Sequence, residues 1–430
     1  MGQKRNAFME MAGRPGAGLV RDPRNVRLYL GRASPESLPC SSLANRPVSL
    51  RIRGMTLRIR SLPARGGGNP YVGLFYDALE RHDVQLVGSL RFDLAWFADH
   101  LDTFDAVHLH WPEYILARFA PPWLERIRGS KIRGSWALSK HLERVFRMQI
   151  QSAKVTWFAS VLEFLKRHDK KIIWTWHNLE PHEDKHRFRS DIYSVLAASA
   201  DLIIFHSGWA EKRCREIYQV DTETVVMMHG NYSGVYPPPR ERDVVAIDLG
   251  FDPTRPIVGC LGNLRHYKGI DVACRAIETS KNPIQFLCAG DPYAGFELDG
   301  LKAHFDSVEG SLLLPRRLSD QEFADFTNLC DIVLLPYRRV TGSGALLAAL
   351  TLGRGVIASD LPFFQEILAH QPDAGRLVQP ENPAALASEI TEYLTVPAEV
   401  RQAAARRLAE RFDWDQVIKP VGEAASRLRL

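Results

Sequence analysis

The sequence lacks the features that mark disulfide-bonded, cysteine-zinc and membrane-spanning proteins. Its six cysteines are scattered without a CxxC pair, a pattern typical of reduced thiols in a cytosol. Cys260 and Cys288 lie inside apolar, strand-like runs, which indicates burial. No apolar run approaches the roughly 20 residues needed to cross a bilayer. We therefore expect a cytoplasmic protein, either soluble or peripheral on the inner face of the cytoplasmic membrane.

The chain also has little net charge once its first residues are set aside. Residues 1–54 carry ten basic side chains against three acidic ones, and the remainder carries 45 against 47. A nearly neutral body gives no electrostatic case for nucleic-acid binding. Residues 1–54 lack a sustained apolar period and are rich in Arg, Gly, Pro and Ser. We expect them to be a disordered extension, with a transit peptide as the alternative, and Met55 to open the fold.

From Met55 onward, short apolar runs alternate with segments of helical period, the pattern of a doubly wound α/β protein with parallel sheets. The length of 430 residues suits two domains. We predict an N-terminal domain over 55–235, a proline-rich linker over 236–256, a C-terminal domain over 257–410 and a final helix over 411–430. The predicted strands are 57–62, 105–109, 171–176, 201–205 and 224–228 in the first domain, and 256–261, 284–289, 331–335 and 355–359 in the second. The predicted helices of the second domain are 270–279, 320–329, 344–352 and 383–395.

Unusual polar residues follow almost every predicted strand. Ligands of open parallel sheets bind just beyond the carboxyl ends of the strands. Two such sheets facing each other across a cleft would therefore collect these groups in one place. In chain order they are 66–68, His108, His110 and Glu113, 177–183, His206 and Ser207, 229–232, 263–268, Gly290 and Asp291, 338–344, and Asp360.

The segment 262–269, GNLRHYKG, links an apolar strand to a helix. Its glycines let backbone amides approach a ligand closely, and Arg265 and Lys268 bring two cations to one face of the first helical turn. A diphosphate is the natural ligand for this arrangement, with Gly262 and Asn263 beside it. A solvated basic helix start is the alternative.

The segment 341–344, TGSG, opens a second helix and could meet an anion with its amides and the positive helix N-terminus. Gly342, Gly344 and the later Asp360 also imitate a dinucleotide fingerprint. However, the third glycine is replaced by Leu347, and the strand-to-glycine turn is too long. An NAD or FAD site is therefore the weaker interpretation.

Two clusters in the first half suit proton transfer or the orientation of substrate hydroxyls. The segment 176–183, WHNLEPHE, places His177 and Glu183 after a strand, and His108, His110 and Glu113 form the second cluster. A polar loop around a structural histidine is the alternative for the first. The HxH spacing also suggests zinc, but no CxxC pair accompanies it, so we expect no metal.

Residues 123–149 hold seven Lys or Arg against two Glu, interleaved with Trp123, Trp136 and Phe146. A basic stretch with aromatic anchors can lie on an anionic membrane surface. A solvated helix face that packs its aromatics inward is the alternative.

Taken together, these motifs resemble a known family. The C-terminal half is similar to the nucleotide-sugar domain of GT-B glycosyltransferases, particularly the family 4-like group. The matching runs are GNLRHYKGI, LLPRRLSDQEFADFTNLCDIVLLPY and GALLAALTLGRGVIASDLPFFQEIL. The run RFDWDQVIKPVGEAA resembles the family's terminal helix, which returns to the first domain. VHLHW and WHNLEPHE resemble runs of bacterial exopolysaccharide transferases, including xanthan-type mannosyltransferases.

The resemblance implies two Rossmann-like domains facing a cleft, a nucleotide-sugar donor and no cofactor or metal. One departure stands out: the family's paired glutamates would fall at Val340 and Ala348, and both are absent. The donor would be held by Gly262, Asn263, Arg265, Lys268, Arg316, Leu318, Thr341, Gly342, Ser343 and Gly344. The expected acceptor residues are Gly68, Asn69, Tyr71 and His110.

The expected activity is transfer of a hexose, with GDP-mannose as the favoured donor, to a hydroxyl of a saccharide or lipid-linked saccharide in exopolysaccharide or cell-surface glycan synthesis. In an inverting reaction, Glu113, Glu183 or His177 would take the acceptor proton. In a retaining one, the leaving phosphate could serve as the base, and His177 would orient the sugar. The other classes are a nucleotide-sugar epimerase, a non-catalytic nucleotide-binding module and a dehydrogenase.

Overall fold

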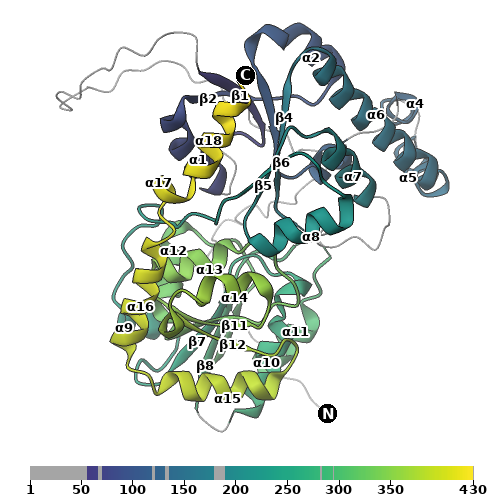
Figure 1. The fold of residues 1–430 in the computed structure, drawn as a ribbon. Coiled ribbons are helices and arrows are strands. Elements are labelled where there is room, and N and C mark those ends of the chain that lie inside the picture. Colours follow the sequence, from purple (N-terminus) through teal and green to yellow (C-terminus); the bar gives the residue numbers. More distant parts are fainter. Residues whose placement is uncertain are drawn as a thin grey trace, which may run out of the picture. The chain divides into compact units, whose positions relative to one another are not determined.

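A computed structural model describes residues 56–429, except 66–69, 119–121, 131–134, 179–188, 281–282 and 294. The expected extension over 1–54 and the candidate residues Gly68, Asn69 and Glu183 therefore lie outside the described residues. Within these residues the chain forms two sheets of six parallel strands each, which confirms the predicted α/β class (Figure 1). The part of the chain from Arg53 onward forms one compact unit.

The first sheet has the strand order β2-β1-β3-β4-β5-β6. Its central strands are apolar because helices cover both of their faces, as parallel sheets require; β4, KIIWTW, is buried from Ile172 to Trp176. We call this sheet and its helices the first lobe. Its strands are β1 Leu57–Leu62, β2 Val84–Ser89, β3 Ala106–Leu109, β4 Lys171–Trp176, β5 Leu202–Phe205 and β6 Glu223–Val226. Its helices are α1 Pro70–Leu79, α2 Leu94–His100, α3 Glu113–Arg118, α4 Pro122–Arg128, α5 Ser135–Val145, α6 Arg147–Arg167, α7 Arg189–Ser199 and α8 Gly208–Tyr218.

The second sheet has the order β12-β11-β10-β7-β8-β9, and with its helices it forms the second lobe. Four helices were expected here, and α10 and α12 have the predicted bounds, while α13 and α15 end one residue earlier. The strands are β7 Ile257–Leu261, β8 Gln285–Ala289, β9 Ser311–Leu314, β10 Ile332–Leu335, β11 Gly355–Ser359 and β12 Gly375–Val378. The helices are α9 Arg242–Asp248, α10 Ile270–Thr279, α11 Asp299–Ser307, α12 Asp320–Leu329, α13 Gly344–Thr351, α14 Pro362–Leu368, α15 Pro383–Leu394 and α16 Ala398–Glu410. The last two helices of the described chain are α17 Trp414–Val417 and α18 Lys419–Arg427.

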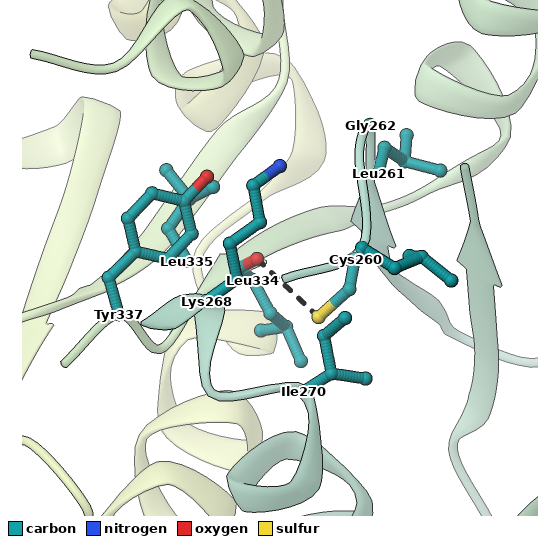
Figure 2. Close-up of a pocket in the computed structure, with 9 residues that line it drawn as sticks. Cys260, Leu261, Gly262, Lys268, Ile270, Leu334, Leu335 and Tyr337 are labelled. Carbon is teal, nitrogen blue, oxygen red and sulfur yellow. Dashed lines mark hydrogen bonds between the residues drawn. The ribbon is translucent and has the colours of Figure 1, made fainter. Parts of the chain in front are cut away.

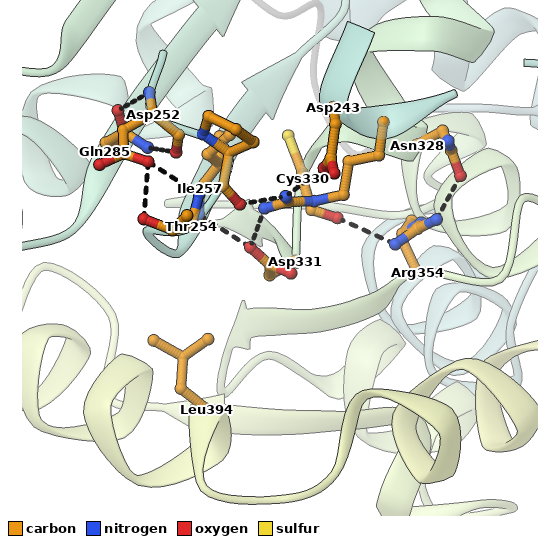
Figure 3. Close-up of polar contacts among 12 residues, drawn as sticks. Asp243, Asp252, Thr254, Ile257, Gln285, Asn328, Cys330, Asp331, Arg354 and Leu394 are labelled. Atoms are coloured by element: carbon orange, nitrogen blue, oxygen red, sulfur yellow. Dashed lines mark hydrogen bonds and ion pairs between the residues drawn. The ribbon is translucent and has the colours of Figure 1, made fainter. Parts of the chain in front are cut away.

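The proline-rich segment over 236–256 is not devoid of secondary structure, because it contains α9. Val245 and Ala246 of this helix are fully buried against the second lobe. Arg242 fixes the helix from its polar side: its guanidinium donates to the Asp331 carboxylate at 2.9 Å and to the Pro253 carbonyl at 2.8 Å. Asp331 also accepts from the backbone N–H of Ile257, so the segment is tied to the start of β7 (Figure 3).

After α16 the chain returns to the first lobe, which confirms the predicted crossover. Helices α17 and α18 contact α1, and α18 also contacts β6 (Figure 1). Trp414 and Ile418 are buried in the same apolar cluster as Phe75 of α1. The Trp414 indole N–H donates to the Asn231 carbonyl at 2.7 Å, so the crossover is held by both packing and a hydrogen bond.

Gly230 is required for this return. A Cβ added at residue 230 would lie 2.2 Å from the Trp414 indole, far inside van der Waals contact. We therefore expect Gly230→Ala to lower the free energy of unfolding by about 1–3 kcal/mol through overpacking. Gly73→Ala is the matched control, because nothing lies within 4 Å of the added Cβ. Chemical denaturation of both variants measures the difference, and equal stabilities would contradict the prediction.

Candidate active site

Four histidines gather around Tyr71 at the carboxyl ends of the first sheet. His110, His177 and His206 follow β3, β4 and β5, and His229 lies after β6. Their ring centroids lie 4.9–5.8 Å from that of Tyr71, which comes from the first turn of α1. All of these rings except His177 are buried. We call Tyr71, His110, His177, His206 and His229 the histidine cluster. Tyr71 and His110, which were predicted to contact an acceptor, are each only 1% exposed.

His108 does not join His110 in a metal-binding pair. Its Nδ1 lies 2.7 Å from the Tyr76 hydroxyl and its Nε2 lies 2.8 Å from the Thr175 hydroxyl, so both ring nitrogens are engaged. Burial lowers the pKa of His108 to about 3, that of His229 to about 3 and that of His206 to about 4. These imidazoles are therefore neutral at physiological pH, and their role is to accept or donate hydrogen bonds.

His177 is held from both lobes. Its ring stacks on Trp111 with centroids 4.4 Å apart and planes inclined by 18°. Its Nε2 lies 3.2 Å from Nδ1 of His110. The Thr341 hydroxyl of the second lobe donates to the backbone carbonyl of His177. The structure thus brings the candidate residues His177, His110 and Thr341 into one contact network.

Glu113 begins α3 and points to the segment that follows β4. Its carboxylate accepts from the Asn178 amide at 3.3 Å and from the Tyr193 hydroxyl at 3.4 Å. Glu113 is half-buried, and its contact with Asn178 connects it to the residue that follows His177. Glu183 cannot be compared with it, because it lies outside the described residues.

On the second lobe, the loop after β7 packs closely against the segment that follows β10. Gly269 has φ +64°, and a Cβ there would lie 2.0 Å from the Pro336 carbonyl oxygen. The turn packs Lys268 back into a small pocket, where its amine lies 5.8 Å from the Tyr337 ring centroid (Figure 2). Lining this pocket are Cys260, Leu261, Gly262, Leu264, Lys268, Ile270, Leu334, Leu335 and Tyr337.

Arg265 lies beside this pocket, with its guanidinium 4.2 Å from the centroid of the Tyr293 ring. Tyr114 of α3 interacts with Arg265 electrostatically, which opposes the rise in the pKa of Tyr114 that burial causes. Arg265 therefore lies where the two lobes meet. Asn263 is exposed on the same loop.

Among the described residues, Lys268 forms no ion pair with a carboxylate, and burial and the charge of Arg265 lower its pKa to about 8. A bound anion stabilises the ammonium form of Lys268. As the pH rises, the free protein loses this proton, so its affinity for an anion falls. We expect pyrophosphate binding to weaken steadily between about pH 7.5 and 9. Isothermal titration calorimetry across this range measures the effect, and Lys268→Gln should be weak and insensitive to pH. A wild-type affinity that does not change over this range would contradict the prediction.

The other second-lobe candidates lie in two places. Thr341 and Ser343 are buried, and Ser343 caps α13 by accepting from the Leu346 N–H at 3.2 Å. Gly342 lies against the His206 ring, which a Cβ at residue 342 would approach to 3.5 Å. Gly344 lies against the Tyr232 hydroxyl, so segment 341–344 meets the histidine cluster directly.

Arg316 and Leu318 follow β9, away from these contacts. Arg316 is exposed and pairs with Glu322 at 2.6 Å, and that hydrogen bond lowers the pKa of Glu322 to about 2. Leu318 packs against the core of the second lobe. Val340 and Ala348, which occupy the positions of the family's glutamates, are both buried in that core. These two positions therefore offer no carboxylate to a ligand.

Among the described residues, no group of three or more His, Cys, Asp and Glu side chains could hold a metal ion. Residues 182–186 read HEDKH, which matches the zinc-binding HExxH pattern. They lie outside the described residues, so a metal-free site remains a prediction. No described helix combines the length and apolar character that a membrane span requires.

Comparison with known proteins identifies the chemistry. Residues 255–395 match the family described as Glycosyl transferases group 1, and this stretch contains both segments, 262–269 and 341–344, that were predicted to bind an anion. A GDP-mannose:glycolipid 4-beta-D-mannosyltransferase of Xanthomonas campestris pv. campestris is 24% identical over 302 residues, which cover 67% of this chain and 69% of that protein. The chain is a group 1 glycosyltransferase with the GT-B fold. It transfers a sugar from a nucleotide sugar, and members of this group typically do so without a metal.

A second relative is also similar in sequence, and two solved structures share the fold. The transferase is 24% identical over 225 residues to the lipopolysaccharide core biosynthesis mannosyltransferase LpsB of Rhizobium meliloti, which covers 47% of this chain and 63% of LpsB. Anabaena HepE in complex with UDP and glucose has the same fold, with a TM-score of 0.60 and 14% identity over 86% of this chain and 100% of HepE. Sucrose-phosphate synthase from Thermosynechococcus elongatus has a TM-score of 0.57 and 18% identity over 85% and 82% of the two chains.

Some site residues were not among those chosen from the sequence. The strand-end rule marked both His206 and His229, but neither was chosen as a candidate site residue. Trp111 and Tyr293 act through ring stacking on His177 and Arg265. Trp111 ends the VHLHW run, but nothing in that run indicates stacking on His177, and Tyr293 belongs to no motif.

Proposed function

We propose that the transferase moves mannose from GDP-mannose to a hydroxyl of a lipid-linked saccharide during exopolysaccharide or cell-surface glycan synthesis. The main observation in support of this proposal is the pair of cations, Arg265 and Lys268, on the loop after β7. This loop lies next to segment 341–344, which contacts His177. GDP and mannose are proposed because two relatives are named as mannosyltransferases and one of these names specifies GDP-mannose. A lipid-linked acceptor is proposed because that name also specifies a glycolipid.

We further propose that the reaction inverts the anomeric carbon. GDP-mannose carries its sugar in α linkage, and the Xanthomonas relative is named for a β-linked product. The loss of carboxylates at Val340 and Ala348 fits a departure from the usual family 4-like site. Inversion requires a base, and Glu113 is our candidate because its carboxylate accepts a hydrogen bond from Asn178, the residue that follows His177.

In this mechanism the acceptor hydroxyl gives its proton to Glu113 and its oxygen forms a bond to the anomeric carbon. The bond from that carbon to the diphosphate oxygen breaks on the opposite face, and GDP leaves as an anion. Arg265, Lys268 and the amides of 341–344 meet the negative charge that develops on the diphosphate. Charge stabilisation therefore comes from side chains and a helix start.

The decisive test of the donor is a thermal-shift panel of GDP, UDP, ADP and NAD, followed by proton NMR of the product. A ligand at a hundred times its dissociation constant adds about 2.7 kcal/mol of stability. We expect GDP to give the largest shift and the product to be a β-mannoside. A thermal shift with NAD alone would instead indicate a dehydrogenase. Conversion of the donor without any acceptor would indicate an epimerase.

Contact with an anionic membrane is the proposed route to a lipid-linked acceptor. In α5 and at the start of α6, the apolar side chains Trp136, Leu138 and Met148 are 66%, 51% and 56% exposed. Basic residues accompany them, including Lys140, whose amine lies 5.8 Å from the Trp136 ring centroid. Exposed apolar side chains beside cations are the pattern of a surface that enters the headgroup region.

We expect the transferase to sediment with vesicles that contain phosphatidylglycerol and to bind phosphatidylcholine vesicles weakly. Trp136→Ala with Met148→Ala should reduce binding at least fivefold, because each loses an apolar contact worth about 1–2 kcal/mol. Ile247→Ala with Val244→Ala, which removes exposed apolar side chains from α9 of the second lobe, is the control. Equal binding by the two double variants would contradict the assignment of this surface.

A further inference from the structure

Arg338 joins the two segments that we propose to bind the diphosphate. It lies between β10 and segment 341–344, but its contacts go to residues 262–269, which we call the donor loop. The backbone N–H of Arg338 donates to the Tyr267 carbonyl at 2.7 Å. Its Nη1 donates to the His266 carbonyl at 2.6 Å. One residue thus holds two consecutive carbonyls of the donor loop.

Two carboxylates hold the Arg338 guanidinium in place. Nη1 and Nη2 form a forked pair of hydrogen bonds with the Asp271 carboxylate, at 3.0 Å and 2.8 Å. Nε donates to the Glu381 carboxylate at 3.0 Å. Such bonds fix the direction of the side chain, because the N–H groups of a guanidinium lie in one plane. The charge of Arg338 is already matched by two carboxylates, so this residue is poorly suited to bind an anion itself.

The donor loop also packs closely against the residues just before Arg338. The rings of Tyr267 and Tyr337 meet edge to face, with centroids 5.6 Å apart. Gly269 of the loop leaves no room for a side chain, because a Cβ there would lie 2.0 Å from the Pro336 carbonyl oxygen. The two stretches of chain therefore form one packed unit, joined by backbone, ring and guanidinium contacts.

The donor loop depends on these outside contacts because its own structure is a single tight turn. Residues 266–268 form a 3₁₀ turn, in which the hydrogen bond from the Gly269 N–H to the His266 carbonyl is 3.3 Å long. Turns of this kind have poorer hydrogen-bond geometry than an α-helix. The Arg338 side chain is 30% exposed, so its replacement should loosen the loop without unfolding the second lobe.

From these contacts we infer that Arg338 is a positioning residue for the diphosphate of the donor. It holds the donor loop in a fixed position relative to segment 341–344 before the donor binds. The cations Arg265 and Lys268 and the amides of that segment then meet the diphosphate without rearranging. Groups that are already in place when charge develops stabilise a transition state at no cost of reorganisation. The inference deepens the proposed function and rests on it for the presence of a diphosphate at Arg265 and Lys268.

Hydrogen–deuterium exchange, measured by mass spectrometry, tests the positioning directly. Arg338→Met keeps a long side chain without the guanidinium, and we expect the peptide that covers the donor loop to exchange at least about fivefold faster than in wild type. Arg275→Met is the matched control. Arg275 also donates to the Asp271 carboxylate, at 3.4 Å, but none of its side-chain hydrogen bonds within the described chain reaches the donor loop. Unchanged exchange of the loop in Arg338→Met would overturn the inference.

Binding of inorganic pyrophosphate, measured by isothermal titration calorimetry, tests the link to the donor site. We expect Arg338→Met to weaken binding about tenfold, because the loop must then be ordered when the anion binds. Arg338→Lys keeps the charge but cannot form the forked contacts, and we expect it to weaken binding at least about threefold. Arg275→Met should bind as wild type does. Wild-type affinity in Arg338→Lys would mean that only the charge at residue 338 matters, and it would overturn the positioning role.

A double-mutant cycle shows whether Arg338 acts through the donor loop. In a protein that already carries Arg265→Ala and Lys268→Ala, adding Arg338→Met should lower kcat/KM for sugar transfer by less than about twofold further. The reason is that the loop then has no cations left to position. A further loss as large as that in the wild-type background would mean that Arg338 acts independently of these cations, and it would overturn the inference.

The outcomes distinguish the inference from the proposed function. If the Arg265 and Lys268 double variant keeps wild-type turnover, the proposed donor site fails and the inference fails with it. If that variant is impaired but both Arg338 variants bind pyrophosphate as wild type does, only the positioning role of Arg338 is overturned. Thermal unfolding shows whether Arg338→Met is folded. Arg338→Lys, which keeps the charge, decides the question even if it is not.

Discussion

Replacing Arg265 and Lys268 together by alanine is expected to lower kcat/KM for sugar transfer by about 10²–10⁴-fold, because charge-assisted hydrogen bonds of about 1.5–3 kcal/mol each are lost. These bonds form with the diphosphate as it leaves, so kcat should fall along with donor affinity. Steady-state kinetics with GDP-mannose measure the effect. Arg265 also loses its stacking on Tyr293 in this variant, so the two single substitutions should not simply add.

The matched control removes two cations from the same lobe. Arg275→Ala with Lys302→Ala deletes exposed side chains of α10 and α11, which are 54% and 53% exposed. The change in net charge is the same, and we expect transfer to be unaffected. Undiminished turnover in the Arg265 and Lys268 variant would refute their role at the diphosphate and, with it, the location of the donor site.

Glu113→Gln should lower kcat by about 10²–10⁴-fold, the usual contribution of a positioned general base. The substitution keeps the size of the side chain and one oxygen to accept from Asn178, while the new amide N–H group can donate to the Tyr193 hydroxyl oxygen. GDP affinity should therefore stay near that of wild type. The loss should be confined to the chemical step, which rapid-quench measurements of a single turnover resolve.

Glu163→Gln is the control for this experiment, because Glu163 is exposed on α6 and pairs there with Arg167. If the Glu113→Gln protein has the kcat of wild type, Glu113 is not the general base. Glu183 would then be the carboxylate to test next. A retaining product anomer together with full activity would remove the need for a base altogether.

The sequence predicted most of the fold because the central strands are buried on both faces. Such strands are continuous apolar runs, and β4, KIIWTW, was located with its observed bounds. The three unpredicted strands, β2, β9 and β12, all lie at sheet edges. Edge strands pair on one side only and are less buried; β9 has no fully buried residue. Their sequences therefore carry a weaker signal.

The candidate site was predictable only where one segment carries the information. Arg265 and Lys268 share a short loop, and His177 lies in a run rich in polar groups, so local patterns were sufficient. The stacking of Trp111 on His177 and the hydrogen bond from Thr341 depend on how separate segments pack.

The return of the chain to the first lobe has a consequence for how this enzyme is made in the cell. Trp414, Ile418 and Val421 fill the same buried cluster as Leu57 and Phe75, which lie at the opposite end of the described chain. During synthesis the first lobe must wait for these residues before its interior is complete. Until then, a patch of apolar side chains next to Tyr71 stays open to solvent, where a chaperone could bind it. Premature termination shortly before Trp414 would therefore damage the lobe that was synthesised first.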